Sequence, residues 1–236
     1  MREENLSLCI IPARGGSKRI PRKNIRDFCG QPMIAWSIDA ALKSGVFDQV
    51  IVTTDDAEIA DVARSAGAEV PFKRPSDLSD DFTTTQPVIA HAIQAMGCTA
   101  TSDLPVCCLY ATAPFVRPTD LSGALAQFAN SEAKALVMAI TSFAFPIQRA
   151  LRRDVDGQLS MVQSEYLSTR SQDLEDFWHD AGQFYITSSN RWCNDELLLN
   201  GPSYGIELPR QRVQDIDTEE DWQMAELLFR AQTLDH

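Results

Sequence analysis

The chain alternates between two hydrophobic patterns from its first apolar segment onward. Short runs of aliphatic and β-branched residues bounded by polar turns are typical of buried strands. These runs are Leu6 to Ile11, Val50 to Thr54, Val106 to Tyr110 and Leu136 to Thr141. Between them, apolar residues recur at helical spacing and predict helices with one buried stripe each. The stripes run from Ile34 to Leu42, Ile59 to Ala66, Ile89 to Met96 and Leu121 to Phe128.

Strands and helices that alternate in this order predict an α/β fold. Because right-handed crossovers place the helices over both faces of a parallel sheet, we expect a Rossmann-like three-layer sandwich with a mostly parallel, twisted sheet. A later strand at Gln183 to Thr187 and a final helix at about Glu219 to Ala231 complete the pattern. The 236 residues suit one large core, so we predict a single domain, 1–236. Ligands of such sheets bind beyond the carboxyl ends of the strands.

The alternation breaks at about 143–180. Charged residues there surround short apolar pieces that form no complete helical or strand stripe, and these pieces include Phe143, Phe145, Ile147, Leu151 and Met161. We interpret the segment as an excursion from the sheet that serves as a lid or as a dimerisation arm. Because a partner chain would bury the apolar pieces, we predict a homodimer.

Charge and cysteine content narrow the function and the compartment. The formal net charge of −12 disfavours binding to nucleic acid, which relies on Lys and Arg, so we expect a small nucleotide at most. The apolar run from Leu6 to Pro12 is too short for a membrane span or a signal peptide, and we expect no membrane partner.

Six cysteines lie scattered in apolar stretches without a CxxC motif and predict a reduced, cytoplasmic protein. Adjacent Cys107 and Cys108 should point to opposite faces of a strand.

The segment 11–24, IPARGGSKRIPRKN, concentrates the candidate chemistry. The first predicted strand runs directly into Gly15 and Gly16, and five cations lie within positions 14–23. Glycines let backbone N–H groups approach an anion, and Lys and Arg supply the charge that a triphosphate requires. The segment therefore predicts a phosphate-binding loop, although it lacks the spacing of a P-loop and of a dinucleotide fingerprint. The alternative is a basic surface loop.

The stretch IIPARGGSKRIPRKNI resembles the N-terminal signature of the CMP-sialic acid synthetase family, the cytidylyltransferases that activate sialic and related nonulosonic acids. Further matches follow in family order, and the resemblance covers nearly the whole chain. They are VIVTTDD at 50–56, RPSDLSDDFTTT at 74–85, ATAPFVRP at 111–118 and QDIDTEEDW at 214–222. The resemblance implies a nucleotidyltransferase that transfers CMP from CTP to the anomeric hydroxyl of a nonulosonic acid and releases pyrophosphate.

Three departures from the sialic acid pattern resemble the branch that activates pseudaminic acid. Arg19 stands where sialic acid synthetases usually carry Gly, and the segments at 110–114 and 180–185 differ as well. CMP-sialic and CMP-legionaminic acid synthesis remain alternatives.

The resemblance also implies roles for individual residues. Phosphate and catalytic roles fall on Arg14, Lys18, Lys23 and Asp217, and further CTP contacts fall on Ala13, Gly15, Ser17, Asn24, Arg74 and Thr85. Sugar contacts are assigned to Tyr110, Thr112, His179 and Gln183. Thr83 to Thr85 could instead cap the helix that follows them.

Asp215 and Asp217 are the candidate metal ligands. Residues two apart on an extended segment point to the same side, and Mg²⁺ prefers one or two carboxylates completed by water and phosphate. The cofactor expected is therefore Mg²⁺. The alternative is that the acidic run from Asp217 onward starts the last helix, where acidic residues are favoured. Asp55 or Asp56 could likewise cap a helix, and His91 fits a structural role.

Two other classes of protein share some of these features. A nucleotide-sugar glycosyltransferase often uses an Asp-x-Asp metal motif like Asp215-Ile216-Asp217, although that motif normally follows a strand in the middle of the chain. A non-catalytic nucleotide-binding module would bind CTP without turnover.

Overall fold

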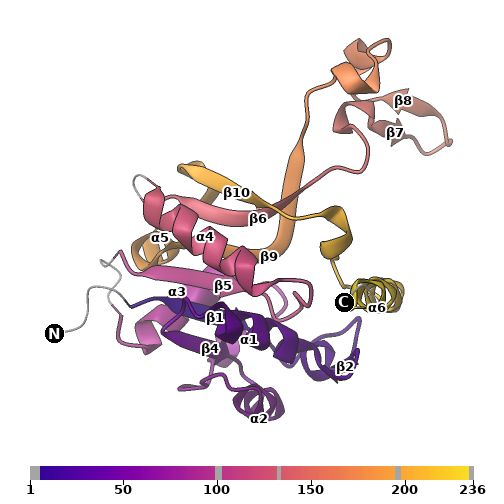
Figure 1. Cartoon of the computed structure of the whole chain (residues 1–236). Coiled ribbons are helices and arrows are strands. Elements are labelled where there is room, and N and C mark those ends of the chain that lie inside the picture. Colours follow the sequence, from indigo (N-terminus) through magenta and orange to yellow (C-terminus); the bar gives the residue numbers. More distant parts are fainter. Residues whose placement is uncertain (1–5, 99–102, 132–133, 195–197, 234–236) are drawn as a thin grey trace.

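A computed structural model describes residues 6–98, 103–131, 134–194 and 198–233. Its centre is a sheet with the strand order β10-β6-β9-β5-β1-β4 (Figure 1). All of these strands are parallel to one another except β9, which runs antiparallel to β5 and β6. The strands are β1 (Leu8–Pro12), β4 (Gln49–Thr53), β5 (Pro105–Leu109), β6 (Leu136–Ser142), β9 (Trp178–Ser188) and β10 (Ser203–Glu207).

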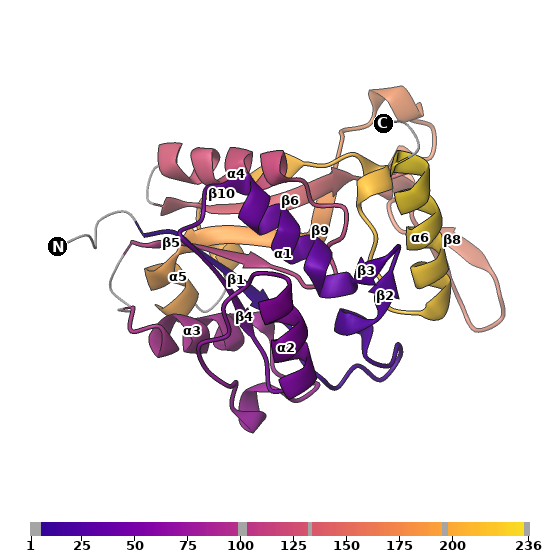
Figure 2. The same ribbon diagram turned by 60° about the horizontal axis from the view of Figure 1, so that its bottom comes forward.

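Helices cover both faces of the sheet. One face carries α1 (Met33–Ser44), α2 (Ala57–Ser65) and α4 (Pro118–Asn130), which lie side by side in Figure 2. The other face carries α3 (Thr85–Ala95) and α5 (Ser189–Asn194). The predicted three-layer α/β sandwich with a mostly parallel sheet is therefore confirmed.

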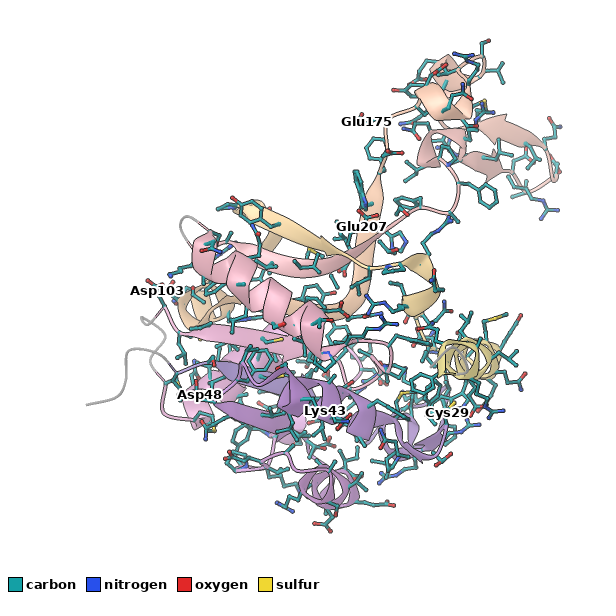
Figure 3. All side chains as sticks on the ribbon, in the orientation of Figure 1. Cys29, Lys43, Asp48, Asp103, Glu175 and Glu207 are labelled. Carbon is teal, nitrogen blue, oxygen red and sulfur yellow. The ribbon has the colours of Figure 1, made fainter. Side chains whose placement is uncertain are left out.

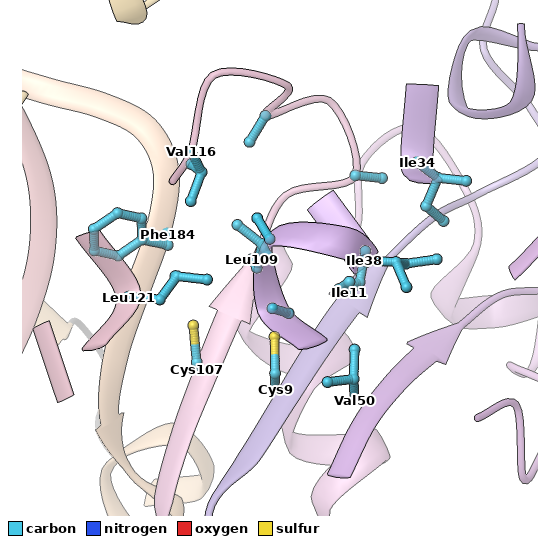
Figure 4. Packing of buried hydrophobic residues seen from close by; sticks show 14 of the residues in the cluster. Cys9, Ile11, Ile34, Ile38, Val50, Cys107, Leu109, Val116, Leu121 and Phe184 are labelled. Carbon is cyan, nitrogen blue, oxygen red and sulfur yellow. The ribbon is translucent and has the colours of Figure 1, made fainter. Parts of the chain in front are cut away.

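The alternation of side chains along each strand builds these two cores. Cys9 and Cys107 pack toward α1 and α4, on the same side of the sheet (Figure 4), whereas Cys108 packs toward α3. This confirms that the two adjacent cysteines point to opposite faces. All six cysteines are free.

A third, smaller core lies at one end of the sheet. Here α6 (Glu219–Thr233) packs on the small ribbon of β2 (Asp27–Phe28) and β3 (Gln31–Pro32). The rings of Phe28 and Trp222 meet edge to face with their centroids 5.3 Å apart. Because the segment 210–217 leads into α6, this packing holds it next to the residues that follow β1.

The predicted excursion leaves the sheet after β6 and re-enters at β9. Ser142 and Trp178 pair across the two strands, so the excursion spans 143–177. It holds a small hairpin of β7 (Leu151–Arg153) and β8 (Leu159–Met161) and projects away from the sheet (Figures 1 and 3), with Glu175 near its base. Short 3-10 helices flank the hairpin at Ile147–Arg149, Ser164–Tyr166 and Ser171–Asp173.

The remaining short helices lie in loops around the sheet. They are the 3-10 turns Lys23–Ile25, Ser76–Leu78, Leu198–Asn200 and Arg210–Arg212. Within the described ranges, no helix combines the length and the apolar content needed to cross a membrane.

Candidate active site

The strand order creates a crevice between β1 and β5. From β1 the chain moves through α1 to β4 on one side, and through α3 it then returns to β5 on the other side. Such a reversal leaves an open crevice at the carboxyl ends of the two strands. A cavity of about 610 Å³ lies there. Its walls contain ten residues predicted from the sequence: Arg14, Ser17, Lys18, Lys23, Asn24, Arg74, Thr85, Tyr110, Thr112 and Asp217.

The loop after β1 is held in place by its own backbone and by the loop after β4. The amide of buried Asn24 donates a hydrogen bond of 3.0 Å to the carbonyl oxygen of Arg14. The N–H of Gly15 donates to Oδ1 of Asp55 at 3.2 Å. Asn24 and Asp55 therefore fix the path of the loop.

Asp56 is the second anchor of this loop. Its carboxylate accepts two hydrogen bonds from Arg22, at 2.5 and 3.0 Å, and also accepts from the N–H of Ile59, which caps α2. Arg22, followed by the cap, lowers the pKa of Asp56 to about 2. The expectation that Asp55 or Asp56 caps a helix is thus confirmed for Asp56.

This packing gives a prediction for the two glycines of the loop. A Cβ at Gly15 would lie 2.7 Å from Oδ2 and 3.0 Å from Cβ of Asp56, whereas a Cβ at Gly16 would have no neighbour within 4 Å. Because Asp56 is held by Arg22 and by the α2 cap, it cannot move away cheaply. Gly15→Ala should therefore displace the loop and cost about 1–3 kcal/mol of stability. Gly16→Ala is the matched control. Its free energy of unfolding should stay within roughly ±0.5 kcal/mol of the wild type, which corresponds to a melting temperature within about 1–2 °C. Equal melting temperatures for the two variants would contradict this packing.

Four cations of the loop are paired with two carboxylates. One oxygen of Asp81 lies 2.7 Å from Arg14 and the other pairs with Lys18. Asp217 lies 2.6 Å from Arg19 and 3.2 Å from Lys23. Lys23 also donates to the carbonyl oxygen of Ile216 at 2.7 Å, so this lysine ties the phosphate loop to the segment before α6.

Arg74 supplies a buried charge to the wall of the cavity, next to the end of β4. Its side chain is only 4% exposed, and burial lowers its pKa to about 10, which still leaves it protonated at neutral pH. One Nη donates to the carbonyl oxygen of Thr53, but Nε has no partner within the described part of the chain. A buried donor without an acceptor is costly, and a ligand acceptor in the cavity would remove that cost.

The threonines at the start of α3 do not cap it with their side chains. Instead, Oγ1 of Thr85 lies 3.0 Å from the hydroxyl oxygen of Tyr110, which follows β5. The cap interpretation for these residues is therefore wrong.

Asp217 is also free of a capping role. The start of α6 is closed by Thr218 and Asp221, since Oδ2 of Asp221 accepts from the N–H of Thr218 at 2.8 Å and the hydroxyl of Thr218 accepts from Asp221 N at 3.2 Å. Asp217 turns its carboxylate into the cavity. The pKa of the neighbouring Asp215 is raised, first by partial loss of hydration and then by the charge of Asp217.

A second cavity, of about 420 Å³, adjoins the first and shares Thr84, Thr85 and Tyr110 with it. Its wall is mostly apolar and includes Leu136, Met138, Tyr185, Trp192 and Leu199. Sequence reasoning assigns no site to these residues and notes only the segment 180–185, which contains Tyr185. Sequence reasoning could have found Trp192 from its position, because it closely follows the strand with which the chain returns to the sheet.

Five residues predicted from the sequence line neither cavity: Ala13, Gly15, Asp215, His179 and Gln183. Ala13 and Gly15 belong to the loop backbone. Gln183 is 2% exposed and donates at 2.6 Å to the carbonyl oxygen of Arg212, so it packs inside the protein. His179 lies at the base of the excursion with its ring 4.9 Å from that of Phe143. The structure therefore does not bring these two polar side chains to the site.

The comparison with known proteins gives one decisive result. A family model described as cytidylyltransferase matches residues 8–227. This chain belongs to the cytidylyltransferase family. The resemblance found in the sequence is confirmed, and the chain is a member of an enzyme family that transfers cytidylyl groups.

Similar proteins match this chain over almost their whole length. The pseudaminic acid cytidylyltransferase of Campylobacter jejuni is 44% identical over 224 residues, covering 95% of this chain and 96% of its own. The CMP-N,N'-diacetyllegionaminic acid synthase of Legionella pneumophila is 32% identical, covering 94% and 95%. A solved CMP:2-keto-3-deoxy-manno-octonic acid synthetase complexed with CTP has the same fold, with a TM-score of 0.70 at 18% identity over 96% of this chain and 99% of that one. Neither the glycosyltransferase nor the non-catalytic module gains support from these matches.

Proposed function

We propose that this enzyme transfers CMP from CTP to the anomeric hydroxyl of pseudaminic acid and releases pyrophosphate. The observation that carries the proposal is the cavity between β1 and β5, whose wall combines the cationic loop with Asp217 and shares residues with a second, apolar cavity. The name of the Campylobacter jejuni relative supports the choice of sugar. The free cysteines and the need for CTP favour work in the cytoplasm.

The first cavity suits the nucleotide. Arg14, Lys18 and Lys23 would hold the triphosphate, with Ser17 and the N–H groups of the loop as further donors. Arg74 would offer its unpaired Nε–H to an acceptor of the cytidine. The cavity thus offers charge for the phosphates together with a buried donor that lacks a partner within the described residues.

The carboxylates at 215 and 217 suit Mg²⁺. They are hard oxygen donors next to the phosphate loop, and Asp217 is not consumed by the helix cap. No three His, Cys, Asp or Glu side chains converge within the described segments, so substrate phosphates and water would complete the shell. We therefore propose that Asp217, assisted by Asp215, holds the ion. When bound, Mg²⁺ would offset phosphate charge and polarise the α-phosphate.

The reaction proposed is an in-line displacement at the α-phosphorus. A bond forms between the anomeric oxygen and that phosphorus as the bond to the bridging oxygen breaks, the hydroxyl loses its proton, and pyrophosphate leaves. Lys23 is well placed to stabilise the developing charge because its ammonium group is held by the carbonyl oxygen of Ile216 and its side chain is only 18% exposed. Arg14 and Lys18 would follow the departing phosphates. No covalent enzyme intermediate is needed.

The second cavity suits the sugar. Its aliphatic wall, which includes Leu136 and Met138, fits the methyl end of pseudaminic acid better than the hydroxylated tail of sialic acid. Tyr110 stands at the boundary of the two cavities, where nucleotide and sugar must meet. The hydroxyl of Tyr185 donates to Asp180 at 2.7 Å, so one polar side of this cavity is already fixed.

Incubation with CTP, Mg²⁺ and a panel of nonulosonic acids, read out by pyrophosphate release, tests the proposal. We expect a large preference for pseudaminic acid over sialic acid, because a site that pairs with acetamido groups rejects a sugar that places hydroxyls there. Preference over legionaminic acid, which also carries acetamido groups, would come from stereochemistry. Comparable kcat/KM values on two sugars would remove the pseudaminic assignment. Absence of turnover with every sugar, despite CTP binding, would favour a non-catalytic module.

Asp217→Asn tests the carboxylate. Loss of one anionic ligand should lower kcat about tenfold to a hundredfold, a range typical of weakened metal sites, and shift half-saturation by Mg²⁺ upward. The CTP dissociation constant should change much less. Glu219→Gln is a suitable control because Glu219 pairs with Arg26 outside the cavity. An unchanged Mg²⁺ dependence of Asp217→Asn would exclude the metal role.

We also propose a homodimer formed through the excursion at 143–177. Apolar side chains there are widely exposed, among them Phe145 at 83%, Leu159 at 63% and Leu167 at 69%. Sedimentation should show a dimer at micromolar concentration, and Phe145→Glu with Leu159→Glu should give a monomer. Leu227→Glu, at a 63% exposed position on α6, is the control and should remain dimeric. A fully active wild-type monomer would overturn this proposal.

A further inference from the structure

The proposed reaction leaves one carboxylate of the cavity without a task. Asp81 comes from the loop between the 3-10 turn Ser76–Leu78 and α3, and it lines the phosphate end of the cavity. Asp217, the other carboxylate that bridges two cations, has a use as a metal ligand. Among the residues that the structure describes, the Asp81 carboxylate pairs with Arg14 and Lys18, which the triphosphate itself would need.

Asp81 meets these groups with both of its oxygens. Oδ1 lies 2.7 Å from Nη1 of Arg14, and Oδ2 pairs with Nζ of Lys18. The two cations, and Lys18 more than Arg14, hold the pKa of Asp81 below its ordinary value, so the group is charged at neutral pH. A carboxylate that presents one oxygen to each of two cations occupies them as two oxygens of a phosphate would.

The loop behind Asp81 is built to hold this position and also to release it. Oδ1 of Asp80 accepts from the N–H groups of Phe82 and Thr83 at 2.9 and 2.6 Å, which fixes the turn. The carbonyl oxygen of Asp80 accepts a further hydrogen bond of 2.7 Å from Arg14. The Asp81 side chain remains 33% exposed and that of Lys18 81% exposed, so these ion pairs are open to water and weak.

We propose that Asp81 is a tethered competitor for the phosphate sites, which leaves Arg14 and Lys18 when CTP binds and returns to them as pyrophosphate departs. The inference rests on the proposed function, because it assigns these two cations to the CTP phosphates. Its physical basis is electrostatic. If the Asp81 carboxylate stayed on the two cations, it would strongly repel a triphosphate that binds them at contact distance. The consequence is faster release of pyrophosphate at the cost of weaker CTP binding.

The test compares Asp81→Asn with Asp77→Asn by calorimetric titration with CTP, pyrophosphate and cytidine. Asp77 is an exposed acid of the neighbouring 3-10 turn, outside the cavity, so its variant makes the same change in net charge. Asp81→Asn should bind CTP and pyrophosphate about threefold to tenfold more tightly than the wild type, as expected for the loss of two exposed ion pairs. Its affinity for cytidine, which lacks phosphates, should not change, and Asp77→Asn should match the wild type throughout. Pyrophosphate should also become a stronger product inhibitor of Asp81→Asn.

The outcomes separate this inference from the proposed function. Unchanged or weaker binding of pyrophosphate by Asp81→Asn overturns the competitor role and makes Asp81 a positioning residue for Arg14. A wild-type protein that binds pyrophosphate but not CTP overturns the proposed function alone, and tighter pyrophosphate binding by Asp81→Asn then still supports the competitor. Asp81→Ser serves as a second variant if Asp81→Asn melts well below the wild type.

Discussion

Replacing Lys23 with Ala should lower kcat/KM for CTP by about 10²- to 10³-fold, the loss typical of removing one preorganised donor to a developing anion. Lys23 is the least exposed cation of the phosphate loop, at 18% of its side chain, and two contacts hold its ammonium group. Its charge is therefore in place before the reaction and needs no reorganisation. Because the same group balances Asp217, the variant should also bind Mg²⁺ with an altered affinity.

Steady-state kinetics and thermal melting together check this prediction. Lys43→Ala is the control, since Lys43 pairs with Asp39 on the outer surface of α1, away from the cavity. A folded Lys23→Ala variant with activity close to that of the wild type would show that Lys23 has no catalytic role. A variant that has lost activity only because it has unfolded would be recognised by its melting temperature.

Arg212→Met is expected to cost about 3–5 kcal/mol of unfolding free energy, the usual result of leaving one member of a buried ion pair alone. Arg212 and Asp120 are 8% and 11% exposed and form two hydrogen bonds, of 2.6 and 3.1 Å. Arg212 also donates to the carbonyl oxygen of Phe115. Its removal would leave the Asp120 carboxylate buried without a counter-charge, and the melting temperature should fall by roughly 6–20 °C for a chain of this size.

The matched control is Arg210→Met, at an exposed position two residues away that should melt within 2 °C of the wild type, a shift of under about 1 kcal/mol. The double variant Arg212→Met with Asp120→Leu should recover part of the loss, because no buried charge remains. Recovery should be incomplete, since Asp120 also accepts from the N–H of Arg117 at the start of α4. If Arg212→Met melts like Arg210→Met, the pair contributes nothing to stability.

The sequence pattern predicts the parallel strands β1, β4, β5 and β6 because these strands are buried on both faces. Each reads as a continuous apolar run, as in LCIIP of β1. It does not predict β10, an edge strand whose residues are mostly exposed and which exists through its pairing with β6. For β9 it finds only the apolar end, because the first part, Trp178 to Gly182, carries polar and exposed residues. Helix α5, with six residues, is too short for a periodic signal.

Some residues of the candidate site are likewise predictable from the sequence, and others are not. The phosphate loop is predictable from its residues, because a strand end followed by unusual chemistry marks the edge of a parallel sheet. Arg74 and Tyr110 are reached only through the family resemblance. Asp81 and the apolar second cavity are not, since each depends on a contact between segments far apart in the chain. Gln183 shows the reverse case. Its amide suggests a ligand contact, but its partner is the carbonyl oxygen of Arg212, which arrives 29 residues later.

The reversed direction of β9 has a consequence for how this architecture can vary. Because Ser142 and Trp178 face each other in an antiparallel pair, the chain leaves and re-enters the sheet at one point. In an all-parallel sheet the return would need a crossover helix over one face, so an insertion there would disturb a covering layer. Here the inserted segment is attached to the sheet only through the ends of one antiparallel strand pair. It can be lengthened, exchanged between relatives or trimmed to a tight turn while the walls of the nucleotide crevice keep their strands and their register.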